Sequence, residues 1–236
     1  MLSRILRYLN SLTSRTLPHL PGPWRLPILT RMLKWTTEDE REAFHLPRIG
    51  PCKGHAIDIG ANYGLYSYGL QRYYDSVTSF EPNTAIAAPL IAAAYPNVRI
   101  VHDALSSHSG TAILHIPKQN GVILSGWASL EPEVATEAQS LIDIEVPIST
   151  LDSHQLQNVG FIKIDVEGHE LEVLLGAEQT IRQFKPHLLI EIQDKHLPAI
   201  RSLLTTWGYT ETTLPKLGGP NGSPQNYIFL PTPTSL

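Results

Sequence analysis

Short apolar runs alternate with segments of helical spacing between residues 55 and 207, an order typical of parallel β-α-β units. Five of the runs predict the strands of a core sheet, at residues 55–59, 77–80, 98–102, 161–166 and 187–192. The segments that follow four of these strands predict helices, at residues 64–74, 84–94, 171–184 and 197–207. The pattern therefore predicts an open α/β sheet with mostly parallel strands.

Two pairs of segments depart from this alternation. Residues 111–116 and 142–148 alternate apolar and polar positions, which predicts two extra strands on either side of a polar stretch. Residues 209–213 and 226–230 flank a loop rich in proline and glycine, which predicts an antiparallel hairpin that closes the sheet. We refer to the polar stretch between the extra strands, residues 117–140, as the excursion.

The first 50 residues lack the strand and helix alternation, so we divide the chain into an N-terminal helical extension at residues 1–50 and an α/β domain at residues 51–236. Apolar residues at helical spacing, with two arginines on the opposite face, predict a basic amphipathic helix over residues 2–13. Such a helix either contacts an anionic membrane surface or a partner, or docks on its own domain, which is commoner. Four prolines between residues 18 and 27 predict an extended connector, after which residues 28–35 resume a helical pattern.

Composition fits one globular domain with an extension, since the 236 residues are 42% hydrophobic and 17% charged. Residues 1–35 hold six basic residues and no acid, so a whole-chain charge of −4 leaves −10 on the remainder. This acidity argues against general binding of nucleic acid. The single cysteine, Cys52, excludes an intramolecular disulfide or a CxxC metal cluster and predicts a cytoplasmic location. No apolar run is long enough to predict a transmembrane helix.

Acidic residues lie at the ends of four predicted core strands, as Asp58, Glu81, Asp103 and Asp165. The carboxyl ends of neighbouring parallel strands line one crevice, so we expect these residues to converge there. Glu81 is placed to accept hydrogen bonds from both hydroxyls of a ribose. Asp103 is placed to accept one from the amine of an adenine ring, with Ala104 in apolar contact. A lone carboxylate is more often solvated, but four at successive strand ends indicate a nucleoside site.

The turn after the first strand distinguishes between classes of nucleoside. Gly60 permits the turn and Gly64 lets the next helix pack closely, but Asn62 stands where the GxGxxG fingerprint has its second glycine. A side chain at that position crowds the path of a pyrophosphate, which disfavours a nicotinamide dinucleotide. The turn favours a nucleoside without phosphates that carries cationic groups, and S-adenosylmethionine meets this description.

Several motifs then resemble the FkbM family of S-adenosylmethionine-dependent methyltransferases. They occur in the family's order over residues 55–210, as Asp58-Ile-Gly-Ala-Asn-Tyr-Gly-Leu-Tyr-Ser67, Phe80-Glu-Pro-Asn83, Ala104-Leu-Ser106, Thr150-Leu-Asp152, Lys163-Ile-Asp-Val-Glu-Gly-His-Glu170 and Leu174-Leu-Gly-Ala177. The resemblance implies a Rossmann-like class I fold with a seven-stranded sheet. It also implies methyl transfer, usually to a hydroxyl oxygen of a sugar or natural product. The family's usual asparagine before Ala104 is replaced here by Asp103.

Together, the strand ends and the resemblance assign binding of S-adenosylmethionine to one set of residues: Asp58, Gly60, Asn62, Gly64, Glu81, Pro82, Asp103, Ala104 and Asp165. The acceptor side is assigned to Asp165, Glu167 and His169, which alternate after the fourth strand. One of them can orient the acceptor hydroxyl while another takes its proton, and His169 is the best base because the ordinary pKa of histidine is about 6.5. Asp165 can instead hold the amino group of the cofactor.

Alternatives to these roles are open. Residues 167–170 can equally form a helix N-terminus, where acidic side chains meet the helix dipole. Lys163 is expected to be a buried partner of an acid, and we expect no metal ion. The excursion is long enough to be a lid or substrate loop, in which Trp127 either stacks on the acceptor or anchors the loop.

Three functions follow from these features. The first is an O-methyltransferase that acts on a small-molecule acceptor, a sugar or natural product with a hydroxyl group. The second is a catalytically silent S-adenosylmethionine-binding scaffold that recruits a partner through residues 1–35, although the intact motif at residues 163–170 favours an enzyme. The third, a nicotinamide-dependent oxidoreductase, is disfavoured by the glycine spacing. The sequence specifies neither the acceptor nor the oligomeric state.

Overall fold

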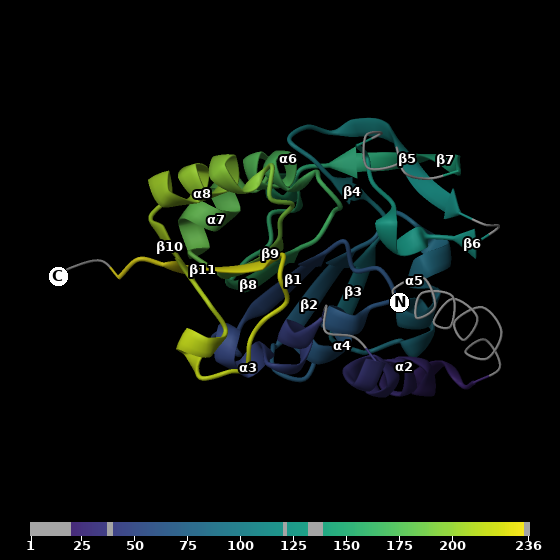
Figure 1. Ribbon diagram of the computed structural model, residues 1–236, viewed down its shortest axis with the longest axis horizontal. Helices are drawn as coiled ribbons and strands as arrows, with labels where there is room; N and C mark the ends of the chain where they lie inside the picture. The colour runs from purple at the N-terminus through teal and green to yellow at the C-terminus, as the bar shows by residue number, and fades with distance from the viewer. Residues whose placement is uncertain (1–19, 37–39, 120–121, 132–138, 234–236) are drawn as a thin grey trace.

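The computed structural model describes residues 20–36, 40–119, 122–131 and 139–233. Its centre is a seven-stranded sheet in the order β10-β11-β9-β8-β1-β2-β3 (Figure 1). Five strands run parallel: β1 (His55–Ile59), β2 (Ser76–Phe80), β3 (Val98–Val101), β8 (Val159–Ile164) and β9 (His187–Glu191). A hairpin of β10 (Tyr209–Thr212) and β11 (Asn226–Pro231) adds to β9 in the antiparallel sense. The structure thus confirms the predicted Rossmann-like class I sheet.

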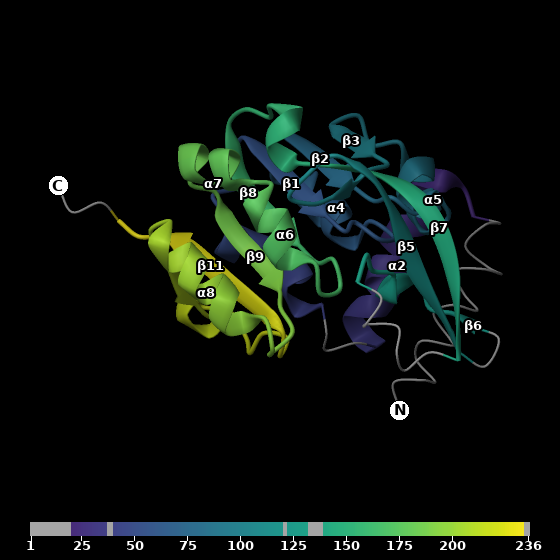
Figure 2. The same ribbon diagram turned by 90° about the horizontal axis from the view of Figure 1, so that it is seen from above.

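Most of the parallel strands are buried along nearly their whole length, because helices cover both faces of the sheet. One face packs against α2 (Gly22–Thr36), η2 (Arg41–Phe44), α3 (Leu46–Ile49), α4 (Leu65–Leu70) and α5 (Thr84–Ala93). The other packs against α6 (Glu170–Leu175), α7 (Glu178–Phe184) and α8 (Leu197–Thr206), as Figures 1 and 2 show. Successive residues of β1 point to opposite faces, so Ala56 is buried in the first layer and Ile57 in the second.

A second sheet stands beside the first, in the order β4-β7-β5-β6 (Figure 2). Its strands are β4 (Ala104–Leu105), β5 (Gly110–Gln119), β6 (Val122–Ile123) and β7 (Ser140–Ser149). The long antiparallel pair of β5 and β7 confirms the two extra strands and extends both beyond their predicted ends. Short 3-10 turns complete the chain: η3 (Ser125–Trp127), η5 (Leu151–His154) and η6 (Pro215–Leu217). The second sheet has a small apolar core of its own around Leu114 and Val146.

The predicted extended connector is wrong, because α2 already begins at Gly22 and contains Pro23 and Pro27. Pro23 is tolerated because it lies in the first turn of the helix, where the missing N–H has no partner within the helix, whereas Pro27 lies inside the helix and removes one of its backbone hydrogen bonds. Leu26 and Leu29 of α2 are buried in the same apolar cluster as the core strands. The amphipathic helix predicted at residues 2–13 lies outside the described residues. Within the described ranges, no helix is long and apolar enough to cross a membrane.

The predicted helix at residues 171–184 is divided into α6 and α7 at Gly176. A Cβ atom at Gly176 would lie 2.0 Å from the carbonyl oxygen of Ser106, so the chain after β4 approaches here as closely as a glycine allows. This contact holds the chain after β4 against the C-terminal end of α6.

Candidate functional site

One cavity gathers most of the predicted site residues at the carboxyl edge of the parallel sheet. Its empty volume is about 590 Å³, open solvent included. The residues on its sheet side are Gly60, Asn62, Glu81, Pro82, Asp103, Ala104, Asp165, Glu167 and His169. Across from them, Leu114 of β5 and residues 126 and 128–130 of the excursion line the cavity. Two predicted residues stay outside its lining: Asp58 lies fully buried in β1, and Gly64 packs against Leu90.

The turn after β1 needs glycine for a steric reason. Gly60 has a φ of +74°, and a Cβ atom there would lie 1.8 Å from the carbonyl oxygen of Asp165. The amides of Gly60 and Ala61 both donate to the carbonyl of Phe80 at 3.0 Å, which fixes the turn after β1 against the end of β2. The close approach of backbone to backbone brings the ends of β1 and β8 together at the cavity.

We expect Gly60→Ala to lower the free energy of unfolding by about 2 kcal/mol or more, because it combines a positive φ with a backbone clash. Gly208→Ala is the matched control, since Gly208 has a φ of +77° and its nearest neighbour is the Lys185 Nζ atom at 3.8 Å. That control should lose about 1 kcal/mol for the positive φ alone. Urea unfolding of both variants measures the difference, and equal losses would refute the steric account.

Glu81 presents a carboxylate that is held by two backbone amides. Its Oε2 accepts from the amide of Asn62 and its Oε1 from the amide of Asn83, each at 2.9 Å. The side chain is nearly buried, and this desolvation raises the pKa of Glu81 to about 7 even though both amides favour the ionised form. Each carboxylate oxygen has a second lone pair, so Glu81 can also accept hydrogen bonds from two neighbouring hydroxyl groups of a ligand in the cavity.

Asp58 lies beneath the turn and supports it from within the core. The Ser67 hydroxyl donates to its Oδ2 at 2.5 Å, and Ser67 and Ser79 share a second hydrogen bond at 2.7 Å. Its Oδ1 is buried without a hydrogen-bond partner among the described residues, so one acceptor position is left in the core. Burial raises the pKa of Asp58, while the charge of Lys163 lowers it in part.

Lys163 is a buried partner of acids, as the sequence predicted. Its Nζ donates to Oδ2 of Asp165 at 2.8 Å and lies 4.6 Å from the centre of the Tyr66 ring. Burial alone would lower the pKa of this ammonium, but the carboxylates of Asp165, Asp58 and Glu40 outweigh burial and raise it. The charge of Lys163 therefore offsets carboxylates from three separate elements.

The carboxyl groups in and near the cavity outnumber the single positive charge of Lys163. Burial, followed by the charges of Asp165 and Glu191, raises the pKa of Glu167 well above its ordinary value. Burial and Asp165 likewise raise the pKa of Glu191, at the end of β9, to about 8. The raised pKa favours the protonated form of Glu167. This residue has a left-handed φ of +54°, as Asn62 has at +52°, so both loops that line the cavity store backbone strain.

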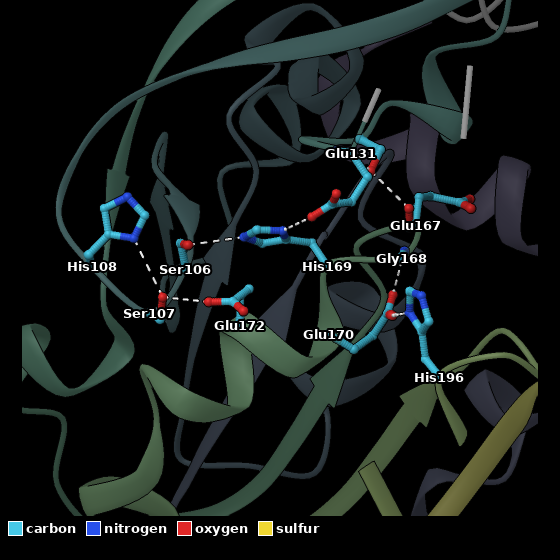
Figure 3. Close-up of polar contacts among 11 residues, drawn as sticks. Ser106, Ser107, His108, Glu131, Glu167, Gly168, His169, Glu170, Glu172 and His196 are labelled. Carbon is cyan, nitrogen blue, oxygen red and sulfur yellow. Dashed lines mark hydrogen bonds and ion pairs between the residues drawn. The ribbon is translucent and has the colours of Figure 1, made fainter. Parts of the chain in front are cut away.

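His169 lies between a serine and a glutamate (Figure 3). Its Nε2 is 3.0 Å from Oγ of Ser106, and its Nδ1 is 2.7 Å from Oε1 of Glu131. Ser129, two residues before Glu131, donates through its hydroxyl to the carbonyl oxygen of Glu167 at 2.8 Å. Sequence reasoning missed Glu131, because it lies in the excursion outside any periodic pattern and 38 residues before its partner.

Other candidate residues have structural contacts. Asp103 lines the cavity and accepts from the Ser149 hydroxyl at 3.0 Å, so its carboxylate is partly occupied. Trp127 is 38% exposed and is absent from the cavity lining, although its neighbours Gly126 and Ala128 belong to it. In the described part of the chain, no three His, Cys, Asp or Glu residues group as metal ligands.

Comparison with known proteins agrees with the motifs and the fold. Residues 58–211 match the Methyltransferase FkbM domain. The chain belongs to the FkbM family of S-adenosylmethionine-dependent methyltransferases. A curated relative, methyltransferase sdnD of Sordaria araneosa, is 24% identical over 201 residues, which cover 69% of this chain and 76% of the relative.

A solved FkbM structure shares the fold. Methyltransferase FkbM from Methylobacillus flagellatus KT aligns with a TM-score of 0.53 and 16% identity. The alignment covers 76% of this chain but only 44% of that one, so this chain spans less than half the length of that FkbM protein. Family membership makes S-adenosylmethionine the cofactor of this chain.

Proposed function

We propose that the protein transfers a methyl group from S-adenosylmethionine to a hydroxyl oxygen of a sugar or small natural product. The observation that carries the proposal is the convergence of Glu81, Asp165 and His169 on one cavity in a chain of this family. Bound S-adenosylmethionine supplies an electrophilic methyl group. The residues of the chain have to bind the cofactor, exclude water, hold the acceptor hydroxyl and take its proton.

The residues present fit this cofactor. The Glu81 carboxylate, fixed by two amides, suits the ribose hydroxyls, and the Gly60 turn lets backbone approach closely. Asp165 carries the negative charge for the amino group of the cofactor, and Asn62, Pro82, Asp103 and Ala104 line the remainder of its site. Asp58 and Gly64 act indirectly, by supporting the turn from below.

The cavity also restricts the acceptor. Four carboxyl groups line it, those of Glu81, Asp103, Asp165 and Glu167, and its described lining includes no lysine or arginine. A phosphate or carboxylate on the acceptor would meet this acidic wall without a counter-charge, which costs several kcal/mol in a poorly solvated site. We therefore assign a neutral or cationic acceptor, such as an unphosphorylated sugar or an amino sugar.

His169 is the proposed base among the three acceptor-side residues. Burial and the charge of Asp165 raise the pKa of Glu167, which favours its protonated form, so we assign it the role of orienting the acceptor hydroxyl. Asp165 is engaged by Lys163. His169 lines the cavity, and imidazole is the side chain best suited as a class to proton transfer near neutral pH.

Glu81 variants test the cofactor assignment. Glu81→Ala should weaken binding of S-adenosylhomocysteine by about 1 to 3 kcal/mol, because the ribose hydroxyls lose their acceptor. In the unaltered protein, affinity should rise between pH 6 and pH 8, since the ribose binds the ionised carboxylate and the pKa of Glu81 is about 7. Calorimetry measures both effects, with exposed Glu145→Ala as the control. Unchanged affinity in Glu81→Ala, or preferential binding of NAD, would overturn the assignment.

A catalytically silent scaffold is the second candidate function. It would bind S-adenosylhomocysteine as the enzyme does, but it would transfer no methyl group to any acceptor. The cytoplasmic location and contact of residues 2–13 with a membrane surface remain proposals drawn from composition.

A further inference from the structure

We infer that Glu131 is a positioning residue for His169: it holds the ring in the tautomer that leaves Nε2 basic, and it does so from the excursion that closes the cavity. The inference rests on the proposed role of His169 as the base. Glu131 belongs to none of the motifs found in the sequence, and its contact with His169 is visible only in the fold (Figure 3).

The chemistry of Glu131 determines which nitrogen of His169 donates a hydrogen bond and which accepts one. An ionised glutamate only accepts hydrogen bonds, so at 2.7 Å from Glu131 the Nδ1 atom of His169 carries the hydrogen. In the neutral ring, Nε2 then has a lone pair and accepts from the Ser106 hydroxyl at 3.0 Å. The other tautomer would set the bare Nδ1 lone pair against the carboxylate of Glu131 and is disfavoured.

The position of Glu131 is itself secured by contacts around Ser129. The Ser129 hydroxyl accepts from the amide of Glu131 at 3.0 Å and donates to the carbonyl oxygen of Glu167 at 2.8 Å. The backbone of Ser129 pairs in both directions with His115 of β5, at 2.8 and 3.1 Å. Ser129 is 2% exposed, so these bonds are shielded from water. Hydrogen bonds to the second sheet and to the loop after β8 thus hold Glu131 where its carboxylate contacts His169.

The arrangement couples closure of the cavity to the state of the base. Residues 126 and 128–130 line the cavity opposite the sheet, and Glu131 follows them directly. When this segment is seated, the imidazole is oriented, and the imidazolium that forms on proton transfer keeps its Nδ1–H on a carboxylate. When the acceptor hydroxyl gives its proton to Nε2, its oxygen would form the new bond to the methyl carbon as the carbon–sulfur bond of the cofactor breaks, with both electrons of that bond going to sulfur to leave neutral S-adenosylhomocysteine. The proton stays on the ring until its release to solvent.

The ring tautomer of His169 tests the inference without any acceptor. Long-range proton–nitrogen NMR at pH 8, where histidine is ordinarily neutral, distinguishes the two tautomers, and the spectrum of His169→Gln assigns the resonance. We expect the Nδ1–H tautomer in the unaltered protein and in Glu131→Gln, whose amide oxygen still accepts. Glu131→Ala should move His169 to the Nε2–H tautomer, and Glu145→Ala should leave it unchanged. A Nε2–H tautomer in the unaltered protein, or no change in Glu131→Ala, would overturn the inference.

Turnover separates this inference from the proposed function. Glu131→Ala should lower kcat by about 10-fold or more, within the 10²- to 10⁴-fold that a general base contributes, and leave KM for S-adenosylmethionine unchanged. Combining Glu131→Ala with His169→Ala should cost no more than His169→Ala alone, because both act through one group. A loss of kcat in His169→Ala but not in Glu131→Ala defeats the inference alone. Unchanged kcat in both variants defeats the proposed base.

Discussion

Replacing His169 with alanine is expected to lower the rate of methyl transfer by about 10²- to 10⁴-fold while leaving the affinity for S-adenosylhomocysteine nearly unchanged. The rate falls because the acceptor hydroxyl loses its base. The affinity holds because Glu81 and the Gly60 turn, which are proposed to bind the nucleoside, do not contact the imidazole. Single-turnover assays with tritium-labelled S-adenosylmethionine and a panel of sugars and amino sugars measure the rate, and calorimetry measures the affinity.

Equal losses of rate and affinity in His169→Ala would contradict this division of roles. Ser106→Ala refines the result, because the Ser106 hydroxyl contacts Nε2 in this structure and is 1% exposed. If the acceptor hydroxyl replaces that of Ser106 at Nε2, the serine variant keeps its turnover. If the proton passes through Ser106, turnover falls nearly as far as in His169→Ala.

Replacing Lys163 with methionine is expected to lower the free energy of unfolding by about 3 to 5 kcal/mol at pH 8. Lys163 is 3% exposed and its ammonium offsets the carboxylates of Asp165, Asp58 and Glu40, which would be left buried without a counter-charge. The loss should shrink toward pH 5, because protonated carboxyl groups need no counter-charge. Denaturant unfolding at both pH values measures the change.

The pH range of this comparison follows from the direction in which folding shifts the pKa of Lys163. The acids raise the pKa of Lys163 above its unfolded value, so its stabilisation is complete below the unfolded pKa and is lost only as pH rises through the folded one. Both test values lie on the stabilised side. Lys185→Met is the control, since Lys185 is exposed, and its Nζ donates to the carbonyl of Trp207 and lies 5.6 Å from the centre of the Tyr209 ring. This variant should lose about 1 kcal/mol or less. Equal losses in the two variants would contradict the account of buried charge.

The sequence predicted the parts of this fold that depend on local pattern. Four of the parallel strands, β1, β2, β8 and β9, are mostly buried because helices cover both faces of the sheet, and acidic residues lie at or just after the strand ends along one edge. The convergence of Glu81, Asp103 and Asp165 on one cavity follows from that topology alone. The role of Gly60 was also predictable from the sequence, because the tight turn that follows the first core strand needs a residue that tolerates close backbone contact.

Features that depend on tertiary contact were not predictable in the same way. The break between α6 and α7 arises because the chain after β4 approaches Gly176, a contact between segments about 70 residues apart. Prolines suggested an extended connector, but burial of Leu26 and Leu29 draws the segment from Gly22 into a helix. Glu131 has no local signal, since its role comes from a loop that is anchored elsewhere by Ser129.

Transfer of a carbon-13 methyl group tests the central claim most directly. The protein is incubated with S-adenosylmethionine labelled at its methyl carbon and a panel of neutral, amino and phosphorylated sugars, and the product is analysed by carbon NMR and mass spectrometry. We predict a methoxy resonance on a neutral or amino sugar and none on the phosphorylated forms. A methyl group on nitrogen or carbon, or no transfer to any acceptor by a protein that binds S-adenosylhomocysteine, would contradict the account.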